Sequence, residues 1–255
     1  MLVITAIIAI LSALLLPAFS SAKRNAAQAS CMNNLKQLGL GMKIYVDDNS
    51  DIFPGCASRH YGYQPEDWIY WRTNTALYPP FKQSPILSSF SGAQRPSFLC
   101  PLDNNFNDRL ALVYPNPPWP PDGYGPYLFS YSLTGYGLDT NNENLGMSSV
   151  VDTSGGTPVI YTFKESSVCN PGNKIMLAEQ PGSLEHNDSP DKNIPDQAKI
   201  VTCGRWTPVG SPVTGPAEPL TVRHSGKADV TFADGHVAPV TSDFGSDAKN
   251  SLPSF

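Results

Sequence analysis

Hydrophobic residues fill the N-terminus of the chain without a single charge. The run from Leu2 to Phe19 reads LVITAIIAILSALLLPAF, and only Thr5, Ser12 and Pro17 depart from its apolar character. As an α-helix its eighteen residues are about 27 Å long, close to the roughly 30 Å hydrocarbon core of a bilayer. The pattern predicts a transmembrane helix over residues 1–21. Pro17 is expected to kink it, because proline lacks the N–H that bonds four residues back.

A cleaved secretory signal peptide is the alternative interpretation of this run. Such a peptide carries positive charge before its apolar core, and here the apolar run begins at Met1 without any. Ser20, Ser21 and Ala22 are small enough for a cleavage site. The run by itself leaves this alternative open.

The next residues repeat with a helical period. From Ala22 to Val46 there is no Pro, and one set of apolar residues recurs at alternating steps of four and three. This set is Cys31, Leu35, Leu38, Met42 and Tyr45. The spacing places it on one stripe of a helix. We therefore expect one continuous helix from about Ile4 to about Val46, in which the amphipathic half, residues 22–50, packs on a head formed by residues 51–255.

The amino-acid composition indicates what kind of fold the head has. The chain holds 25 Pro and 20 Gly, which indicates many turns and few long helices, so a β-rich head with Pro-rich loops is expected. The Pro-dense segment 114–126 is interpreted as a rigid surface connection, with an interaction loop as the alternative, and residues 181–219 as a long excursion between two strands. The net charge is −5 and no basic run is present, which argues against nucleic acid as a partner.

Near the C-terminus the pattern changes to the period of a strand. Residues 228–233 (ADVTFA) alternate in polarity, as in a half-buried strand. Asp234-Gly235 then predicts a two-residue hairpin turn with positive φ at both positions. Across it Phe232 would face Val237, and the returning strand, which contains Pro239, would be an edge strand.

His224, just before this hairpin, has two interpretations. It is either a metal ligand or catalytic base acting with Asp234 and His236, or a buried imidazole that ties the hairpin loop together. We favour the structural role, because this set is poor beside the three or four ligands of a typical metal site. GxSxG, HExxH and Gly-rich phosphate motifs are absent, so we expect no enzyme and no catalytic residue.

A calcium loop is a further candidate. Residues 47–51 (DDNSD) match the first half of an EF-hand loop, but Ile52 stands where that loop needs Gly and Ser58 where it needs Glu. We interpret the segment as a solvated helix terminus, with no cofactor. Calcium bound by oxygen ligands elsewhere, for instance near Glu185 to Asp191, stays open.

Several segments resemble one known family. The apolar run with its internal Pro, followed by a small-residue and basic stretch, resembles the N-terminus of type IV pilins and type II secretion pseudopilins. RHSGKADVTFADGHV, with nine residues between His224 and Asp234-Gly235, resembles the His-x9-Asp-Gly processing-associated motif of a large branch of these proteins. Further familiar segments are 30–54, 97–103 (SFLCPLD), 126–137 (PYLFSYSLTGYG) and 170–180 (NPGNKIMLAEQ).

The resemblance implies an α+β, pilin-like fold, in which a long N-terminal helix packs on an antiparallel sheet. It implies a structural subunit of a type II secretion or type IV pilus-like system, held in the inner membrane by a single pass with a periplasmic or extracellular head, or assembled into a cell-surface filament. Its partners would be inner-membrane lipid and other subunits. The residues expected to pack in the membrane or filament are Leu2, Ile4, Ile7, Ile8, Leu11, Leu15 and Pro17.

The start of the chain departs from that family. There a basic leader ends in Gly, and a prepilin peptidase cleaves after it and methylates the new N-terminus. Alignment on Pro17 places the family's Glu directly before Met1, so leader, cleavage site and Glu are not in this sequence. We expect the true start to lie upstream, and the peptidase and assembly machinery to be partners if a leader exists there.

Two other functions compete with this one. The chain could be a membrane-anchored or secreted binding module, whose aromatic residues capture a saccharide or a protein. Those aromatic residues are Trp68, Trp71, Trp119 and Trp206. A hydrolase using His224 and Asp234 ranks last.

Five cysteines fit neither a metal-binding spacing nor a dense disulfide scaffold. Cys31 lies on the helix stripe that faces the head, and Cys100 follows an apolar segment, so we expect a Cys31–Cys100 disulfide outside the cytoplasm. A Cys169–Cys203 pair is a weaker expectation, with Cys56 free.

Overall fold

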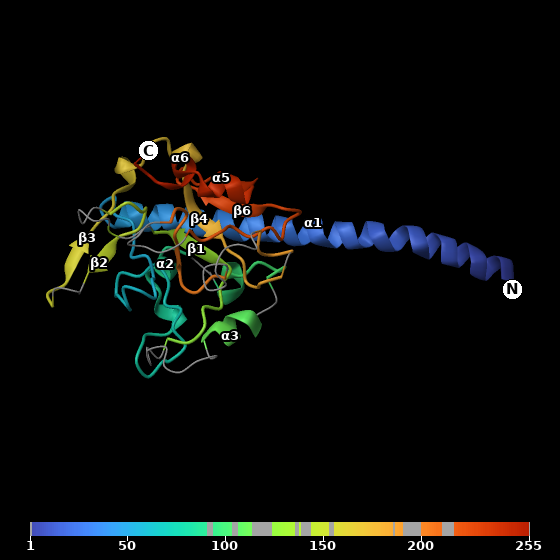
Figure 1. Ribbon diagram of the computed structural model, residues 1–255, viewed down its shortest axis with the longest axis horizontal. Coiled ribbons are helices and arrows are strands. Elements are labelled where there is room, and N and C mark those ends of the chain that lie inside the picture. Colours follow the sequence, from blue (N-terminus) through green and yellow to red (C-terminus); the bar gives the residue numbers. More distant parts are fainter. Residues whose placement is uncertain are drawn as a thin grey trace.

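The computed structural model describes residues 2–90, 94–103, 107–113, 124–135, 138, 144–152, 156–185, 187–190, 200–210 and 217–254, with only the backbone for residues 2, 6–9 and 111–113. One long helix, α1 (Leu2–Asp48), runs along a mixed α+β head and projects far beyond it (Figure 1). The continuous N-terminal helix expected from the sequence is confirmed, and it passes through Pro17 without ending.

The head-bound half of α1 buries the predicted stripe. Cys31, Leu35, Leu38 and Met42 are completely buried, and Tyr45 is partly buried against the same core. Burying a side chain such as leucine stabilises a fold by about 1.5–3 kcal/mol, so this stripe holds the helix to the head. The helix ends at Asp48, in the segment where the sequence placed its end.

A five-stranded sheet forms the centre of the head, in the order β5-β1-β4-β6-β7. Its strands are β1 (Tyr131–Thr134), β4 (Ile175–Glu179), β5 (Arg205–Trp206), β6 (Ala228–Phe232) and β7 (Val237–Val240). The neighbours are antiparallel except β5, which pairs parallel to β1. The expectation of a wholly antiparallel sheet was therefore wrong at this edge. The excursion over 181–219 also supplies a strand, β5, although residues 191–199 and 211–216 lie outside the described part.

Strand β6 is buried on both faces, and the expectation of a half-buried strand was wrong. On one face it lies against α1, where the Thr231 hydroxyl donates a 3.0 Å hydrogen bond to the carbonyl oxygen of Leu35. On the other, Val230 and Phe232 pack in a second apolar cluster with Phe244 of α5 (Ser242–Ser246). Layers on both sides explain why all five residues of β6 are buried.

The turn after β6 also differs from the prediction. The N–H of Gly235 donates to the Phe232 carbonyl and the N–H of Phe232 to that of His236, which closes a three-residue loop over 233–235. Within this loop only Gly235 has a positive φ, +88°. Such a loop carries glycine at its left-handed position, and it shifts the register so that Thr231, not Phe232, pairs with Val237. β7 is an edge strand, as predicted from Pro239.

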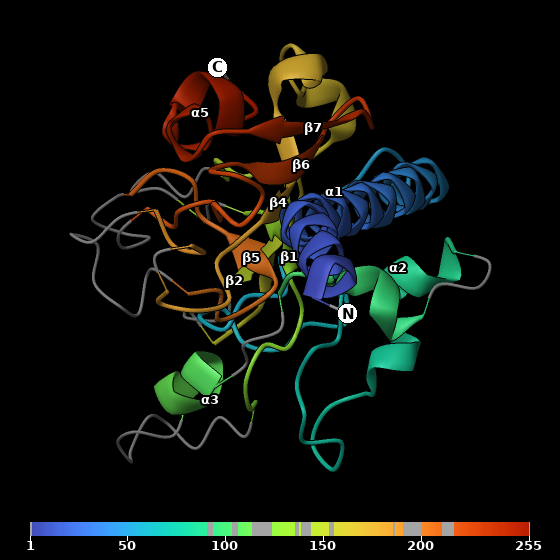
Figure 2. The same cartoon turned by 90° about the vertical axis from the view of Figure 1, so that its right-hand side faces the viewer.

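The remaining elements are short. A small hairpin of β2 (Val150–Asp152) and β3 (Val159–Tyr161) lies at the end of the head away from the projecting helix (Figure 1). The short helices are η1 (Phe81–Gln83), α2 (Pro85–Ser88), η2 (Arg95–Phe98), α3 (Asn107–Val113), η3 (Glu165–Ser167), η4 (Pro171–Asn173) and α6 (Ala248–Ser251). Figure 2 looks along α1 and shows the sheet on one side of it and α2 on the other; α1 contacts both.

Candidate functional site

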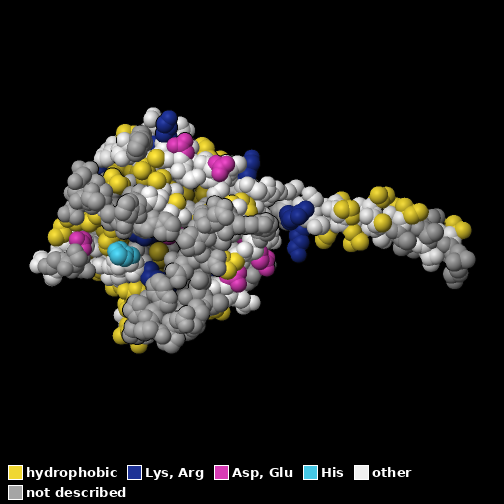
Figure 3. All heavy atoms as spheres, in the orientation of Figure 1, with side chains coloured by type: hydrophobic (Ala, Val, Ile, Leu, Met, Phe, Trp, Pro, Cys, Tyr) yellow, Lys and Arg dark blue, Asp and Glu magenta, His cyan; other side chains and the backbone are white. Residues whose placement is uncertain are grey.

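The projecting half of α1 is the first candidate for function. Its apolar side chains are among the most exposed of the described residues, for example Val3 (72%), Leu14 (69%) and Phe19 (73%). Figure 3 shows hydrophobic side chains along this rod and basic side chains where it meets the head. Among the described residues, α1 is the one helix long and apolar enough to cross a membrane.

The residues expected to pack in a membrane or filament lie on this rod. Ile4, Leu11, Leu15 and Pro17 are exposed. The side chains of Leu2, Ile7 and Ile8 lie outside the described part. Because the head covers none of the apolar stretch, lipid or other protein is free to cover it.

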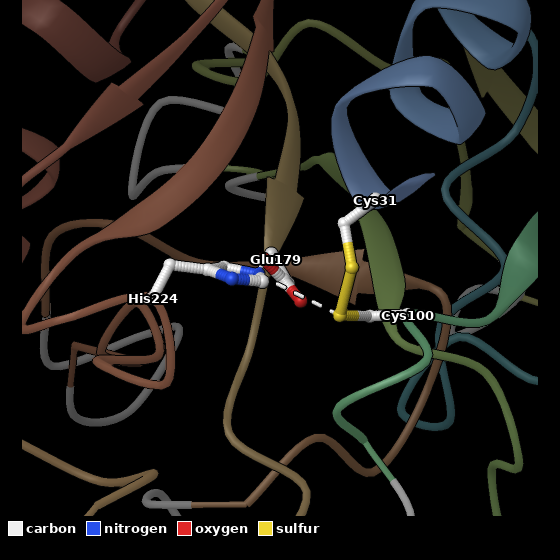
Figure 4. A group of neighbouring side chains, drawn as sticks. All are labelled: Cys31, Cys100, Glu179 and His224. Atoms are coloured by element: carbon white, nitrogen blue, oxygen red, sulfur yellow. Dashed lines mark hydrogen bonds and ion pairs between the residues drawn. A yellow bond between two sulfur atoms is a disulfide. The ribbon is translucent and has the colours of Figure 1, made fainter. Parts of the chain in front are cut away.

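The second candidate is the buried surroundings of His224. Its ring is completely enclosed between β4, β6 and α1, and Nε2 lies 3.0 Å from Oε2 of Glu179. Nε2 is also 3.5 Å from Oδ2 of Asp229 and 3.5 Å from Sγ of Cys100. Figure 4 shows the carboxylate of Glu179 and the ring of His224 directed at one end of the Cys31–Cys100 disulfide.

Burial and neighbouring charges shift the pKa of His224 and that of Asp229. Burial by itself lowers the pKa of His224, but the hydrogen bond to Glu179 and the negative charges of Glu179 and Asp229 outweigh it, so the pKa is raised. Burial raises the pKa of Asp229 to about 6, against the hydrogen bond from Gln28 of α1. The charge of the His224 ring is therefore coupled to the carboxylates of Glu179 and Asp229.

Arg223 links this cluster to further buried acids. Its guanidinium lies 3.6 Å from Glu179, 3.2 Å from Asp103 and 2.8 Å from Asp188. Asp103 in turn pairs with Arg109 of α3 at 2.5 Å. Buried ion pairs keep their charges only when each has a partner, so this network fixes the loop that presents His224.

The expected partners of His224 were wrong in part. We expected its ring to bond within the hairpin loop. Its backbone does so, with mutual hydrogen bonds to Lys227, but the ring bonds Glu179 on another strand. Asp234 instead lies at the exposed turn, where it accepts hydrogen bonds from the backbone N–H of His236 and, at 2.6 Å, from its ring. His224, Asp234 and His236 therefore do not form one metal site.

The cysteine pairing was right for one bridge and wrong for the other. Cys31 and Cys100 form a disulfide with their Cα atoms 4.9 Å apart, and it joins α1 to the segment after η2. Cys169 and Cys203 are both free thiols, because Cys203 lies in the core while Cys169 is exposed. Cys56 is free, as expected.

Sequence reasoning missed the acids around His224. Glu179 ends a strand in which every residue is buried, and Asp229 and Asp103 are buried as well. A signal was present for Glu179: it follows the apolar run IMLA, where a charged residue is unusual unless it is paired. Nothing in the sequence connects that carboxylate to His224, which lies on a distant segment.

The three tryptophans that the structure describes do not form an exposed binding face. Trp68, Trp71 and Trp206 are all buried in the head, and Trp119 lies outside the described residues, like residues 114–123 of the Pro-dense segment.

In each of the two calcium candidates, one aspartate that the structure describes is engaged by protein contacts. Asp51 accepts hydrogen bonds from Ser166 next to the end of α1. Asp188 accepts them from the backbone N–H groups of Gly182 and Ser183 and pairs with Arg223, while Asp191 lies outside the described part.

No protein-family model matches the chain, and comparisons with curated proteins and with solved structures find no similar protein. The case for a function therefore rests on the chain's own residues.

Proposed function

We propose that this protein is a pilin-like structural subunit. It inserts in a membrane through the projecting half of α1, keeps its head outside the cytoplasm, and assembles with further copies through the same helix. The observation that carries this is a single helix whose one half is the spine of the head and whose other half is apolar on all sides and uncovered.

Exposed apolar area supports burial in lipid or protein. Soluble monomers rarely expose contiguous apolar patches beyond a few hundred Å². In lipid a helix satisfies its backbone polar groups internally, and the carbonyl that Pro17 leaves without a partner can be satisfied by a neighbouring helix or a Ser or Thr side chain. Small residues such as Ser12 and Ala13 on the rod allow close helix–helix approach, which favours assembly over a lone anchor.

Two features bear on the side of the membrane where the head lies. Lys23 and Arg24 follow the apolar stretch on the head side, and basic residues next to a span favour the cytoplasm. The Cys31–Cys100 disulfide favours an oxidising compartment, because the cytosol keeps thiols reduced. We give the disulfide more weight. Two basic residues only shift the preferred orientation of the helix in the membrane, whereas two thiols in the cytosol would stay reduced.

Matched substitutions on α1 test insertion. Leu11 (54% exposed) lies on the rod and Leu40 (60% exposed) on the head-bound half of the same helix. An arginine at the centre of a span costs about 2.5–3.5 kcal/mol of insertion free energy, so Leu11→Arg should lower the fraction of the full chain found in membranes. Leu40→Arg should leave that fraction unchanged. Equal membrane fractions for the parent and both variants would contradict anchoring by this helix.

Crosslinking tests assembly separately. In a chain with Cys56, Cys169 and Cys203 replaced by Ser, Ala13→Cys places one thiol on the rod. If copies pack through α1, oxidation in membranes should give disulfide-linked dimers, while Ser88→Cys on α2 should not. If both cysteine variants give only monomers, the helix can still be a membrane anchor, but the proposal that copies assemble through it is contradicted.

A further inference from the structure

Two carboxylates and a sulfur surround one nitrogen of His224. This nitrogen, Nε2, faces one oxygen of Glu179, one of Asp229 and the sulfur of Cys100. Among the described residues, Oε1 of Glu179 and Oδ2 of Asp229 are buried without a hydrogen bond, and so are Nδ1 of His224 and Nη1 of Arg223. Nitrogen, oxygen and sulfur ligand atoms thus meet at one buried point where polar atoms lack partners, and a bound ion is one explanation for such atoms.

Four side chains of the types that bind metals meet at this point. One ligand atom from each of Cys31, Cys100, Glu179 and His224 lies within 4.8 Å of all the others, and all four residues are buried. In a tetrahedral zinc site, bond lengths of about 2.3 Å to sulfur and about 2.0 Å to nitrogen or oxygen separate S and N by about 3.5 Å and N and O by about 3.3 Å. Here Sγ of Cys100 lies 3.5 Å from Nε2 of His224, and Nε2 lies 3.0 Å from Oε2 of Glu179. The two sulfurs are bonded to each other in this structure, so they would have to be reduced and move apart before both could bind a metal.

We propose that, before the Cys31–Cys100 disulfide forms, these four side chains bind one Zn²⁺. Two thiolates, one carboxylate and a neutral imidazole form a set that suits zinc, because thiolates select against calcium and magnesium. Zn²⁺ with two thiolates, one carboxylate and a neutral imidazole has a net charge of −1. The positive guanidinium of Arg223, 3.6 Å from Glu179, would balance it. The proposal does not depend on filament assembly.

Oxidation would exchange the metal for the covalent bond. When an external disulfide reacts with the pair, the sulfurs of Cys31 and Cys100 join, two electrons pass to the external disulfide, and its sulfurs leave as thiolates. The zinc ion loses two of its four ligands and is released. Both states would tie α1 to the head at the same place, so the metal holds this link in a chain that has not yet been oxidised.

The surroundings already support such ligands. The N–H of Asp229 donates to Oε2 of Glu179 at 3.3 Å, and Gln28 holds Asp229 at 3.0 Å. Contacts of this kind orient metal ligands in known sites. A cavity of about 300 Å³ lies next to the site, between α1 and the loop that carries His224, and its lining includes Arg24, Gln28, Leu102 and His224. The side chains of His224 and Glu179 are themselves fully enclosed.

The test uses the full chain in detergent, with Cys56, Cys169 and Cys203 replaced by Ser. A phosphine reduces the disulfide: phosphorus takes oxygen from water, and the two sulfurs take its protons. Co²⁺ serves as the spectroscopic probe, and Zn²⁺ is titrated against a chromophoric chelator. We expect one metal per reduced chain, with thiolate-to-cobalt charge transfer and intense tetrahedral bands, and none for the oxidised chain.

Variants then assign the ligands. Glu179→Gln and His224→Gln should each weaken zinc binding by more than the roughly 10- to 100-fold that loss of an outer contact costs. The matched controls Asp234→Asn and His236→Gln, at the exposed turn, should bind as tightly as the parent. Equal affinity in all four variants would overturn the proposal.

If a ligand variant does not fold, the site can still be tested in the chain that keeps all four ligands. X-ray absorption of the zinc-loaded reduced chain should show two sulfur neighbours at about 2.3 Å and two nitrogen or oxygen neighbours at about 2.0 Å. A different ligand count, binding by the oxidised chain, or no binding by the reduced chain would each refute the site.

Discussion

Nε2 of His224 lies 3.0 Å from Oε2 of Glu179, and this hydrogen bond connects the turn before β6 to the end of β4. The pair lies against the Cys31–Cys100 disulfide, which joins α1 to the segment after η2, so four distant parts of the chain meet at one buried point (Figure 4). The His-x9-Asp-Gly pattern thus joins two separate structural roles. His224 is enclosed in the head, and Asp234-Gly235 forms an exposed turn.

The first prediction concerns His224. His224→Ala removes the donor to Glu179, which keeps a hydrogen bond from the N–H of Asp229. We expect a loss of about 1–3 kcal/mol in the free energy of unfolding, the cost of an unsatisfied buried partner. His236→Ala, at an exposed site, should change stability less. Denaturant unfolding of the oxidised full chain in detergent measures both, and equal losses would contradict a structural role specific to His224.

The second prediction concerns the disulfide. It closes a loop spanning a sequence separation of 69 residues, for which chain entropy predicts about 4 kcal/mol of stabilisation. Replacing both Cys31 and Cys100 by Ser should lower the free energy of unfolding by about this amount, measured with a chelator present. Cys169→Ser, which removes an exposed free thiol, should have no effect. A stable head without the bridge would show that α1 is held by packing alone.

The third prediction concerns acid. Burial raises the pKa of Asp103, but the charges of Arg223 and Arg109 lower it more, so the folded-state pKa lies below its ordinary 3.8. Stability from this group is therefore fully present above pH 3.8 and is lost as the pH falls through the lowered value.

Asp103→Asn should accordingly cost about 3–5 kcal/mol at neutral pH, because it leaves buried arginine charge without its partner. The difference from the parent should shrink below about pH 4. The control Asp243→Asn, an exposed residue in the first turn of α5, should follow the parent at every pH. Thermal unfolding as a function of pH measures all three chains, and a constant difference would contradict the assignment.

The fourth prediction concerns the contact between α1 and the sheet. A Cβ at Gly39 would lie 2.5 Å from the methyl carbon of Thr231, whose hydroxyl is held by the carbonyl of Leu35. Gly39→Ala should destabilise by about 1–3 kcal/mol despite the better helix propensity of alanine.

The same change should reverse sign in a Thr231→Ser background. Serine keeps the hydroxyl and lacks the methyl, so Gly39→Ala should then stabilise by up to about 1 kcal/mol. A double-mutant cycle by denaturant unfolding measures the coupling. Additive effects of the two substitutions would contradict the clash.

Local patterns were sufficient for α1. An uninterrupted apolar run and a stripe at steps of four and three determine a helix and the face that it buries, since both depend on residues a few positions apart. The Cys31–Cys100 pair also followed from local signals, because each cysteine sits in a segment that must face the core.

The sheet and the surroundings of His224 were decided by tertiary structure. The residues of β6 alternate in polarity as in a half-buried strand, yet helices cover both faces of the strand. The sequence of a strand does not predict which elements pack on its two faces. Glu179 and His224 are separated by many residues. The carboxylate of Glu179 is tolerated at the buried end of β4 only because the fold brings two partners to it, the ring N–H of His224 and the guanidinium of Arg223. The sequence by itself therefore determined the helix, its apolar half and the face it buries. Only the folded chain decided which acids enclose the histidine, because the energy of a buried charge depends on partners that long-range packing supplies.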